Sequence, residues 1–274
     1  AFKTSDLYEY LLNLILGLLS NNNLILLDAD LTEQELKLTT IYNELNKKVS
    51  IELPQFDSFY HLIEHFLKSK SEISIFTSGT TGQPKKVIHT ISTLSRAVRR
   101  SDKYSDQVWG FAYNPTHIAG LQVFLQAFVN ENTLVNIFNK NRHEVLSSVE
   151  KYSITNISAT PTFYRLLLPV EKEYLTVNRI TLGGEKSDKK IYELIANIFP
   201  NAKINNIYAS TEAGSLLIAK DENFQIPENL KDKFKVINRE LLIHKSLLAK
   251  SDDFTFENDY YNTGDIVEWA DEMN

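Results

Sequence analysis

A short polar loop, Thr77-Ser-Gly-Thr-Thr-Gly-Gln-Pro-Lys85, carries the clearest chemical pattern in the chain. It follows an apolar run at residues 73–76, which predicts a strand. Glycines after a strand let backbone N–H groups turn toward a phosphate, and the loop adds hydroxyl donors and a lysine cation. Alone, the loop also fits a solvated polar turn. A kinase-type P-loop is a poor fit, because that pattern needs four residues between its glycines and Gly79 and Gly82 have two.

Three later segments combine residue types that suit a nucleotide. Tyr208-Ala-Ser-Thr-Glu212 offers a flat ring, a hydroxyl and a hard oxygen ligand of the kind Mg²⁺ prefers, although a Thr-Glu pair alone is typical of a helix start. Leu182-Gly-Gly-Glu185 would let the backbone approach a flat ring, as many strand-to-helix turns could. Tyr261-Asn-Thr-Gly-Asp265 presents a carboxylate that can accept two hydrogen bonds, or is a plain turn.

Taken in their order along the chain, the four segments resemble the motifs of the adenylate-forming (AMP-binding) enzymes, which include acyl- and aryl-CoA ligases, peptide-synthetase adenylation domains and luciferases. Residues 78–85 match the signature Ser-Gly-Thr-Thr/Ser-Gly-x-Pro-Lys at every fixed position. Such a match arises by chance on the order of once per million chains at ordinary residue frequencies. The resemblance covers roughly residues 70–270 and implies the large N-terminal part of an acyl- or aryl-CoA ligase-like enzyme.

The resemblance implies ATP and Mg²⁺ as cofactors. Tyr208 would stack on adenine, Asp265 would accept hydrogen bonds from the ribose hydroxyls, and the polar loop would hold the β- and γ-phosphates. Ala209 stands where the family usually has glycine, which affects the backbone bend. The expected catalytic residues are Thr211, Glu212, Lys85 and His117, with Glu212 also the metal ligand. The expected nucleotide-binding residues are Thr77, Ser78, Gly79, Thr80, Thr81, Gly82, Gly183, Gly184, Glu185, Tyr208, Ala209, Ser210 and Asp265.

Residues 114–120 resemble the segment that lines the acyl pocket in this family. His117 matches the histidine of CoA-ligase members, and could otherwise be a helix N-terminal residue making a local hydrogen bond. Amino-acid-activating members carry an aspartate in this segment, and no acid lies between Tyr113 and Gly120, so α-amino acids are disfavoured. Aromatic, fatty and dicarboxylic acids remain open. Residues 159–162, 213 and 214 match other pocket-wall positions. The implied acyl acceptor is a thiol, either CoA or the phosphopantetheine of an acyl carrier protein.

The amino-acid composition limits which kinds of binding partner are expected. The net charge is −6 with 23% charged residues, so no excess of Lys and Arg points to nucleic acid or an anionic membrane. The chain has no cysteine, which excludes disulfides and a thiol nucleophile and fits a cytoplasmic protein. The longest apolar run, at residues 14–19, is shorter than the about 20 residues that span a bilayer, and lacks the flanks of a signal peptide.

Alternating strand and helix patterns predict an α/β fold of mostly parallel sheet layers covered by helices, with a small antiparallel β subdomain at the C-terminal end. The helices are expected at residues 57–68, 93–100, 118–129, 142–152, 162–167 and 189–198. The strands are expected at 24–27, 73–76, 108–113, 134–138, 154–158, 179–182 and 203–208, then 216–219, 235–237, 240–244, 254–256 and 266–269.

The opening helix is expected to bury Tyr8, Leu11, Leu12, Ile15, Leu18 and Leu19, and Thr32 with Glu35 forms a capping-box pattern for the next helix. We expect an α/β nucleotide- and acyl-binding region over residues 1–213, of which 1–70 is a shortened N-terminal part. The small β subdomain is expected over residues 214–274.

Two functional hypotheses remain open. Family members end in a mobile C-terminal domain, preceded by an arginine, that delivers a catalytic lysine. No basic residue follows Asp265, so this domain is expected to be absent. The leading hypothesis is part of an enzyme that converts a small carboxylic acid and ATP to an acyl-adenylate, then transfers the acyl group to the thiol. The alternative is a non-catalytic module that binds ATP or acyl-AMP.

Overall fold

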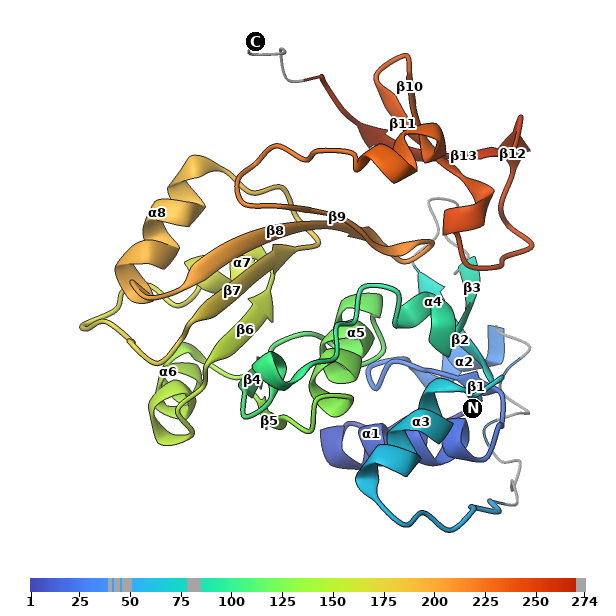
Figure 1. Cartoon of the computed structure of the whole chain (residues 1–274), viewed down its shortest axis with the longest axis horizontal. Coiled ribbons are helices and arrows are strands. Elements are labelled where there is room, and N and C mark those ends of the chain that lie inside the picture. The colour runs from blue at the N-terminus through green and yellow to red at the C-terminus, as the bar shows by residue number, and fades with distance from the viewer. Residues whose placement is uncertain (39–40, 42–44, 46–50, 78–84, 270–274) are drawn as a thin grey trace.

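The computed structural model describes residues 1–38, 41, 45, 51–77 and 85–269. Its centre is a six-stranded sheet in the order β5-β4-β6-β7-β8-β9, in which only the edge strand β9 runs antiparallel to its neighbour (Figure 1). The strands are β4 (Val108–Phe111), β5 (Thr133–Asn136), β6 (Asn156–Ala159), β7 (Arg179–Gly183), β8 (Lys203–Ser210) and β9 (Gly214–Ala219).

Helices cover this sheet, because parallel strands that follow one another need crossover connections. All four residues of β6 are buried, as in a sheet covered on both faces. In α8, Ile191, Ile195 and Ile198 form one buried stripe at helical spacing, and Asp188 caps the helix by accepting from the Ile191 N–H. The covering helices are α5 (Ile118–Phe128), α6 (Arg142–Lys151), α7 (Pro161–Arg165) and α8 (Lys189–Ile198), with a 3₁₀ turn at Asp102–Tyr104.

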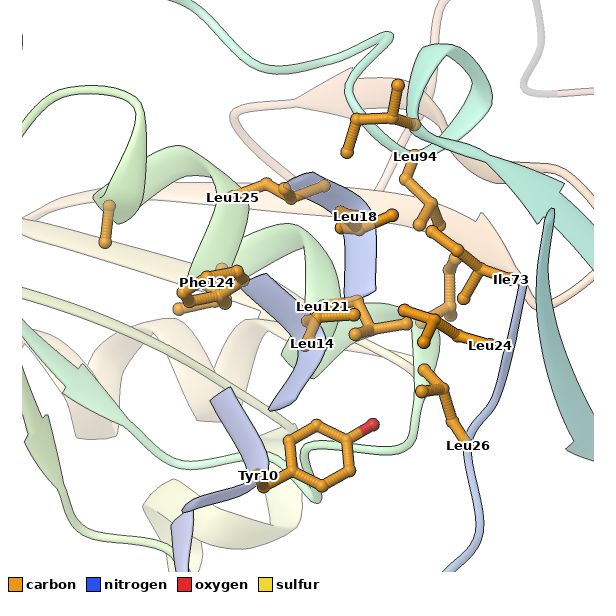
Figure 2. Close-up of a cluster of buried hydrophobic side chains, with 14 of the residues drawn as sticks. Tyr10, Leu14, Leu18, Leu24, Leu26, Ile73, Leu94, Leu121, Phe124 and Leu125 are labelled. Carbon is orange, nitrogen blue, oxygen red and sulfur yellow. The ribbon is translucent and has the colours of Figure 1, made fainter. Parts of the chain in front are cut away.

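The N-terminal part forms a separate three-stranded sheet, β1-β2-β3, parallel between β1 and β2 and antiparallel between β2 and β3. Figure 2 shows its core, where Leu14 and Leu18 of the first helix meet Ile73 of β2 and Phe124 of α5. This core joins the N-terminal sheet to the central one. Its elements are α1 (Leu7–Leu19), β1 (Leu24–Ile25), α2 (Glu33–Leu38), α3 (Phe59–Leu67), β2 (Glu72–Thr77), β3 (Lys85–Thr90) and α4 (Ile91–Leu94).

The predicted buried face of α1 is partly wrong. Tyr8 is 75% exposed and Leu12 40% exposed, whereas Tyr10 and Leu14 are buried. Apolar residues occur on nearly every side of this helix, so periodicity alone does not fix which side meets the core. The capping box before α2 is confirmed, with Thr32 N–H donating to Glu35 Oε2 at 2.7 Å and Glu35 N–H to Thr32 Oγ1 at 3.3 Å.

The prediction for the segment after the polar loop is also wrong. A strand, β3, occupies residues 85–90 where no strand was expected, and the helix that follows spans residues 91–94 rather than 93–100. Thr90 ends the strand and starts the helix, because its side chain accepts from Thr93 N–H while the Thr93 hydroxyl oxygen accepts from Thr90 N–H. The strand was not expected because it begins with two lysines, a residue type that is uncommon in strands.

The C-terminal part forms a four-stranded antiparallel sheet in the order β10-β11-β13-β12. This confirms the small antiparallel unit, with two corrections to its strands. Residues 216–219 belong to β9, at the edge of the central sheet, and the last strand spans residues 260–266 rather than 266–269. The division into domains stays a proposal. The strands are β10 (Phe234–Ile237), β11 (Glu240–His244), β12 (Phe256–Glu257) and β13 (Tyr260–Ile266), with 3₁₀ turns at Glu228–Lys233 and Lys245–Leu247.

Within the described ranges, no helix combines the length and apolar character that crossing a membrane requires.

Candidate nucleotide and acyl site

The two residues that flank the polar loop lie side by side, at the end of β2 and the start of β3. Thr77, the last residue of β2, pairs with Lys85, the first residue of β3. Residues 78–84 lie outside the described residues, so the expected phosphate contacts of Ser78, Gly79, Thr80, Thr81 and Gly82 stay predictions. The Lys85 side chain is half-buried at the start of β3.

Tyr208, Ala209 and Ser210 end β8, as predicted for the second motif, and residues 211–213 form the tight turn to β9. The pairing of β8 with β9 shifts register between Tyr208 and Ala209. The chain therefore turns back immediately after the motif and does not start the helix that a Thr-Glu pair could also have indicated. Thr211 and Glu212 occupy this turn.

The ring of Tyr208 and the carboxylate of Asp265 meet, although they are 57 residues apart in the chain. The Tyr208 hydroxyl donates to Asp265 Oδ2 at 2.6 Å. Burial, followed by the hydrogen bond to Asp265 and its charge, raises the pKa of Tyr208. The hydroxyl is therefore protonated at neutral pH and acts as the donor. This contact joins the end of the central sheet to the C-terminal sheet.

Local hydrogen bonds in β13 orient Asp265. Its N–H donates to Thr263 Oγ1 at 3.1 Å, and the Thr263 hydroxyl donates to the carbonyl of Leu241 in β11 at 2.8 Å. Gly264 N–H donates to Asn262 Oδ1 at 2.9 Å. The Tyr261–Asp265 motif is thus part of a strand and not a free turn.

The Gly183-Gly184-Glu185 segment follows β7, whose register places Gly183 opposite Ile207 of β8. The carboxyl ends of adjacent parallel strands therefore bring this segment and Tyr208 to one edge of the sheet. Gly184 has a φ of +80°, a conformation that favours glycine. The Glu185 carboxylate accepts from Thr162 N–H at 3.0 Å and from the Thr162 hydroxyl at 2.6 Å, at the start of α7.

The acyl-side segment is anchored at Asn114. Asn114 Nδ2 donates to Asp28 Oδ2 at 2.6 Å, and its Oδ1 accepts from the Thr116 N–H at 3.0 Å and hydroxyl at 2.9 Å. A Cβ on Gly120 would lie 2.4 Å from the Asn114 carbonyl oxygen, so only glycine fits. His117 precedes α5, and its exposed side chain makes no capping hydrogen bond, unlike the local bond considered as an alternative.

Glu212 alone among the motif residues offers a carboxylate at the turn beside Tyr208. Burial raises the pKa of both Tyr208 and Tyr261, and the charge of Glu212 adds to both increases. Within the part of the chain that the structure describes, no three His, Asp or Glu side chains converge into a metal cluster. A Mg²⁺ ion held by one carboxylate and the phosphates of a substrate fits this donor set, because Mg²⁺ keeps several waters and rarely uses an all-protein cage.

Two residues at this site were missed from the sequence, His89 and Arg96. His89 is buried in β3, and its Nε2–H donates to the Thr211 carbonyl at 2.7 Å. Burial lowers the pKa of His89 to about 4, so its ring is neutral at pH 7. Arg96 Nη1 donates to the carbonyl of Leu247 at 2.9 Å and to that of Ala213 at 3.5 Å. A lone histidine in a strand gives no sequence signal for such a contact.

The family model for the AMP-binding enzyme matches residues 26–235. The chain therefore belongs to the AMP-binding enzyme family, as the motifs predicted.

A named relative is similar in sequence, and solved structures share the fold. The chain is 30% identical over 220 residues to a 2-succinylbenzoate–CoA ligase of Staphylococcus aureus, a match that covers 71% of this chain and 44% of the relative. The chain thus spans less than half the length of this relative. The unliganded o-succinylbenzoate coenzyme A synthetase of Bacillus subtilis shares the fold with a TM-score of 0.65 at 17% identity, covering 96% of this chain and 67% of that one. The N-terminal domain of FACL13 from Mycobacterium tuberculosis gives 0.59 at 19% identity, covering 77% and 64%.

Proposed function

We propose that the chain binds ATP and activates a carboxylic acid as an acyl-adenylate with release of pyrophosphate. The observation that carries this proposal is the meeting of Tyr208 and Asp265 at one end of β8, beside the strand end that carries Gly183. A ring that can stack on a base and a carboxylate that can accept from ribose hydroxyls are here brought together from two different sheets. This proximity supports a shared role for the two motifs.

The chemistry of the step is attack of a carboxylate oxygen on the α-phosphorus, with pyrophosphate leaving. The protein's contribution is to position two anions and to offset their charge. In this proposal Thr211 donates to the α-phosphate and Glu212 holds the Mg²⁺ that neutralises the phosphates. Lys85 and the donors of residues 77–82 hold the β- and γ-phosphates. Gly183, Gly184 and Glu185 face the adenine opposite Tyr208.

The acyl group would then pass to a thiol, either CoA or the phosphopantetheine of a carrier protein. We place the acid beside His117, whose exposed side chain is free of capping contacts. Because the named relatives are 2-succinylbenzoate–CoA ligases, 2-succinylbenzoate is the first acid to test. No Asp or Glu lies between Tyr113 and Gly120, which supports a carboxylic acid substrate without an ammonium group. We propose a cytoplasmic location, which is consistent with CoA as a substrate and with a chain that contains no cysteine.

The test is a pyrophosphate–ATP exchange assay on the 274-residue chain, with and without Mg²⁺, across aromatic, fatty and dicarboxylic acids. Exchange should require both Mg²⁺ and one class of acid. Glu212→Gln, which keeps the shape and removes the charge, should lower the exchange rate by about 10²–10³, the usual effect of losing one preorganised group. The matched control is Glu257→Gln, at an exposed glutamate of β12.

Two outcomes would contradict the proposal in different ways. ATP binding without exchange for any acid would favour the non-catalytic binding module. A chain that binds neither ATP nor AMP in calorimetry would remove the nucleotide site altogether.

A further inference from the structure

The turn that carries Thr211 and Glu212 is held by its carbonyl oxygens. Thr211 O accepts from His89 Nε2–H of β3 at 2.7 Å, and Glu212 O accepts from Ala249 N–H at 2.7 Å. The third carbonyl, of Ala213, lies 3.5 Å from Arg96 Nη1. Three consecutive carbonyls are thus bonded to three different segments of the chain, which fixes the position of a turn that would otherwise be a short surface connection.

Of these contacts, the one from His89 is the strongest candidate for a specific role. His89 is 1% exposed, so its ring nitrogens find no water to replace a lost partner. A carbonyl oxygen only accepts, so Nε2 must carry the proton. In the neutral ring Nδ1 is then unprotonated, and the Thr93 hydroxyl oxygen lies 3.1 Å from it and 2.9 Å from the Thr90 carbonyl oxygen. The Thr211 carbonyl therefore sets the tautomer of His89, and Thr93 lies beside its second ring nitrogen.

The position of His89 in β3 links this turn to the polar loop. His89 lies four residues after Lys85 in the same strand, about 13 Å along it at the usual rise per residue. The same strand is bonded to the C-terminal part, because Ile88 and Lys250 exchange backbone hydrogen bonds at 2.8 and 3.0 Å. Residue 249 in turn holds Glu212. The strand that opens with the signature lysine therefore sets the place of the turn.

We propose that His89 is a positioning residue for adenylate formation, which holds the Thr211 carbonyl so that Thr211 and Glu212 face the phosphates in a fixed register with Lys85. This inference rests on the proposed function for its catalytic consequence. The positioning itself is a property of the fold and has its own readout.

A matched pair of variants separates the two nitrogens of the ring. The amide nitrogen of His89→Gln reaches the place of Nε2 and can still donate to Thr211. The shorter His89→Asn reaches the place of Nδ1 and cannot. Both put a polar amide into the same buried site, so their effects on global stability should be similar and the difference between them isolates the Thr211 bond.

Hydrogen–deuterium exchange is the first measurement. In His89→Asn, peptides covering residues 209–216 and the Ala249 amide should exchange about tenfold faster, because one hydrogen bond to the turn is gone. The buried strands β6 and β7 should be unchanged. His89→Gln should restore slow exchange to within about threefold. Similar exchange in the unmutated chain and His89→Asn would overturn the proposal.

Pyrophosphate exchange is the second measurement. His89→Asn should lower kcat about tenfold and change the KM for ATP by less than about threefold, because the groups proposed to hold the base and ribose are untouched. His89→Gln should rescue kcat. Equal kcat in the two variants overturns the catalytic role of His89. If the unmutated chain shows no pyrophosphate exchange, the proposed function fails, and hydrogen–deuterium exchange alone decides whether His89 positions the turn.

A second site tests the same contact if His89→Asn does not fold. Thr93→Val leaves His89 in place and removes the hydroxyl beside Nδ1, together with that hydroxyl's bonds to the Thr90 N–H and carbonyl at the start of α4. It should speed amide exchange in residues 209–216, by less than His89→Asn would. Unchanged exchange there means that the orientation of His89 does not control the turn, and contradicts the proposal.

Discussion

The central sheet and the C-terminal sheet hold their functional residues in different ways. In the central sheet, β6 is buried at every position and β7 at all but its first residue, so core packing fixes the strand end that leads to Gly183. In the C-terminal sheet, no residue of β13 is fully buried and Ile266 is 63% exposed. Asp265 is held by two hydrogen bonds: its N–H donates to Thr263 of its own strand, and its carboxylate accepts from Tyr208.

The comparison indicates that the candidate site joins a strand end that core packing fixes and a strand, β13, that has no fully buried residue. Residues whose place depends on a few exposed hydrogen bonds open more readily than residues in a packed core. A nucleotide that contacts both Tyr208 and Asp265 would therefore stabilise β13 more than the strand end at Gly183.

The largest expected effect comes from the core of the central sheet. Ile180 in β7 is fully buried, so Ile180→Ala should lower the free energy of unfolding by about 2–5 kcal/mol through lost burial and a residual cavity. Ile266→Ala, at the end of β13, should change it by less than about 0.5 kcal/mol. Urea titration measures both. Equal losses would mean that β7 and the end of β13 are not packed as differently as the burial of these two residues indicates.

The next effect concerns His89, which connects the two halves. Burial lowers its pKa from 6.5 to about 4, so between these values the unfolded chain takes up a proton that the folded chain does not. The contribution of the neutral His89 ring to the free energy of unfolding is complete above pH 6.5. It is lost as the pH falls toward 4, by roughly 3 kcal/mol in total.

His89→Gln lacks this proton and isolates the effect. The unfolding free energy of the unmutated chain should fall more steeply between pH 7 and 4.5 than that of the variant, since other titrating groups act equally in both. Parallel curves for the two proteins would show that the ring titrates normally in the fold.

Much of this arrangement could be predicted from the sequence. The helix at residues 189–198 was predicted with its observed bounds, because a clear apolar stripe and an N-terminal aspartate mark it. The capping box of Thr32 and Glu35 was also predicted, because it depends only on hydrogen bonds between residues close in the sequence. The order of the motifs also predicted the family.

The remainder depends on contacts between distant residues. Strand β9 was assigned to the C-terminal unit, because a strand sequence does not say which sheet it joins. The bond from His89 to Thr211 spans 122 residues, and nothing near His89 in the sequence indicates it. The predicted buried face of α1 was partly wrong for the same reason. The helix has several apolar faces, and its packing partners determine which of them is buried.

A smaller effect separates the ring of Tyr208 from its hydroxyl. Tyr208→Ala should weaken ATP binding by about 1–3 kcal/mol, the usual loss for an aromatic ring stacked on a base. Tyr208→Phe keeps the ring and loses only the bond to Asp265, so its ATP affinity should stay within about threefold of the unmutated chain. Calorimetry with ATP and AMP checks both. Equal weakening by the two variants would assign the effect to the hydroxyl and remove the stacking role.

The most direct test of the nucleotide site compares ATP with 2′-deoxy-ATP in calorimetry, in the unmutated chain and in Asp265→Ala, with the exposed Asp253→Ala as control. If Asp265 accepts from the ribose hydroxyls, the unmutated chain and Asp253→Ala should prefer ATP by roughly tenfold, the effect of one hydrogen bond to a charged group. Asp265→Ala should bind both nucleotides weakly and almost equally. Equal affinity of the unmutated chain for the two nucleotides would contradict the placement of the ribose at Asp265, and with it the site between the two sheets.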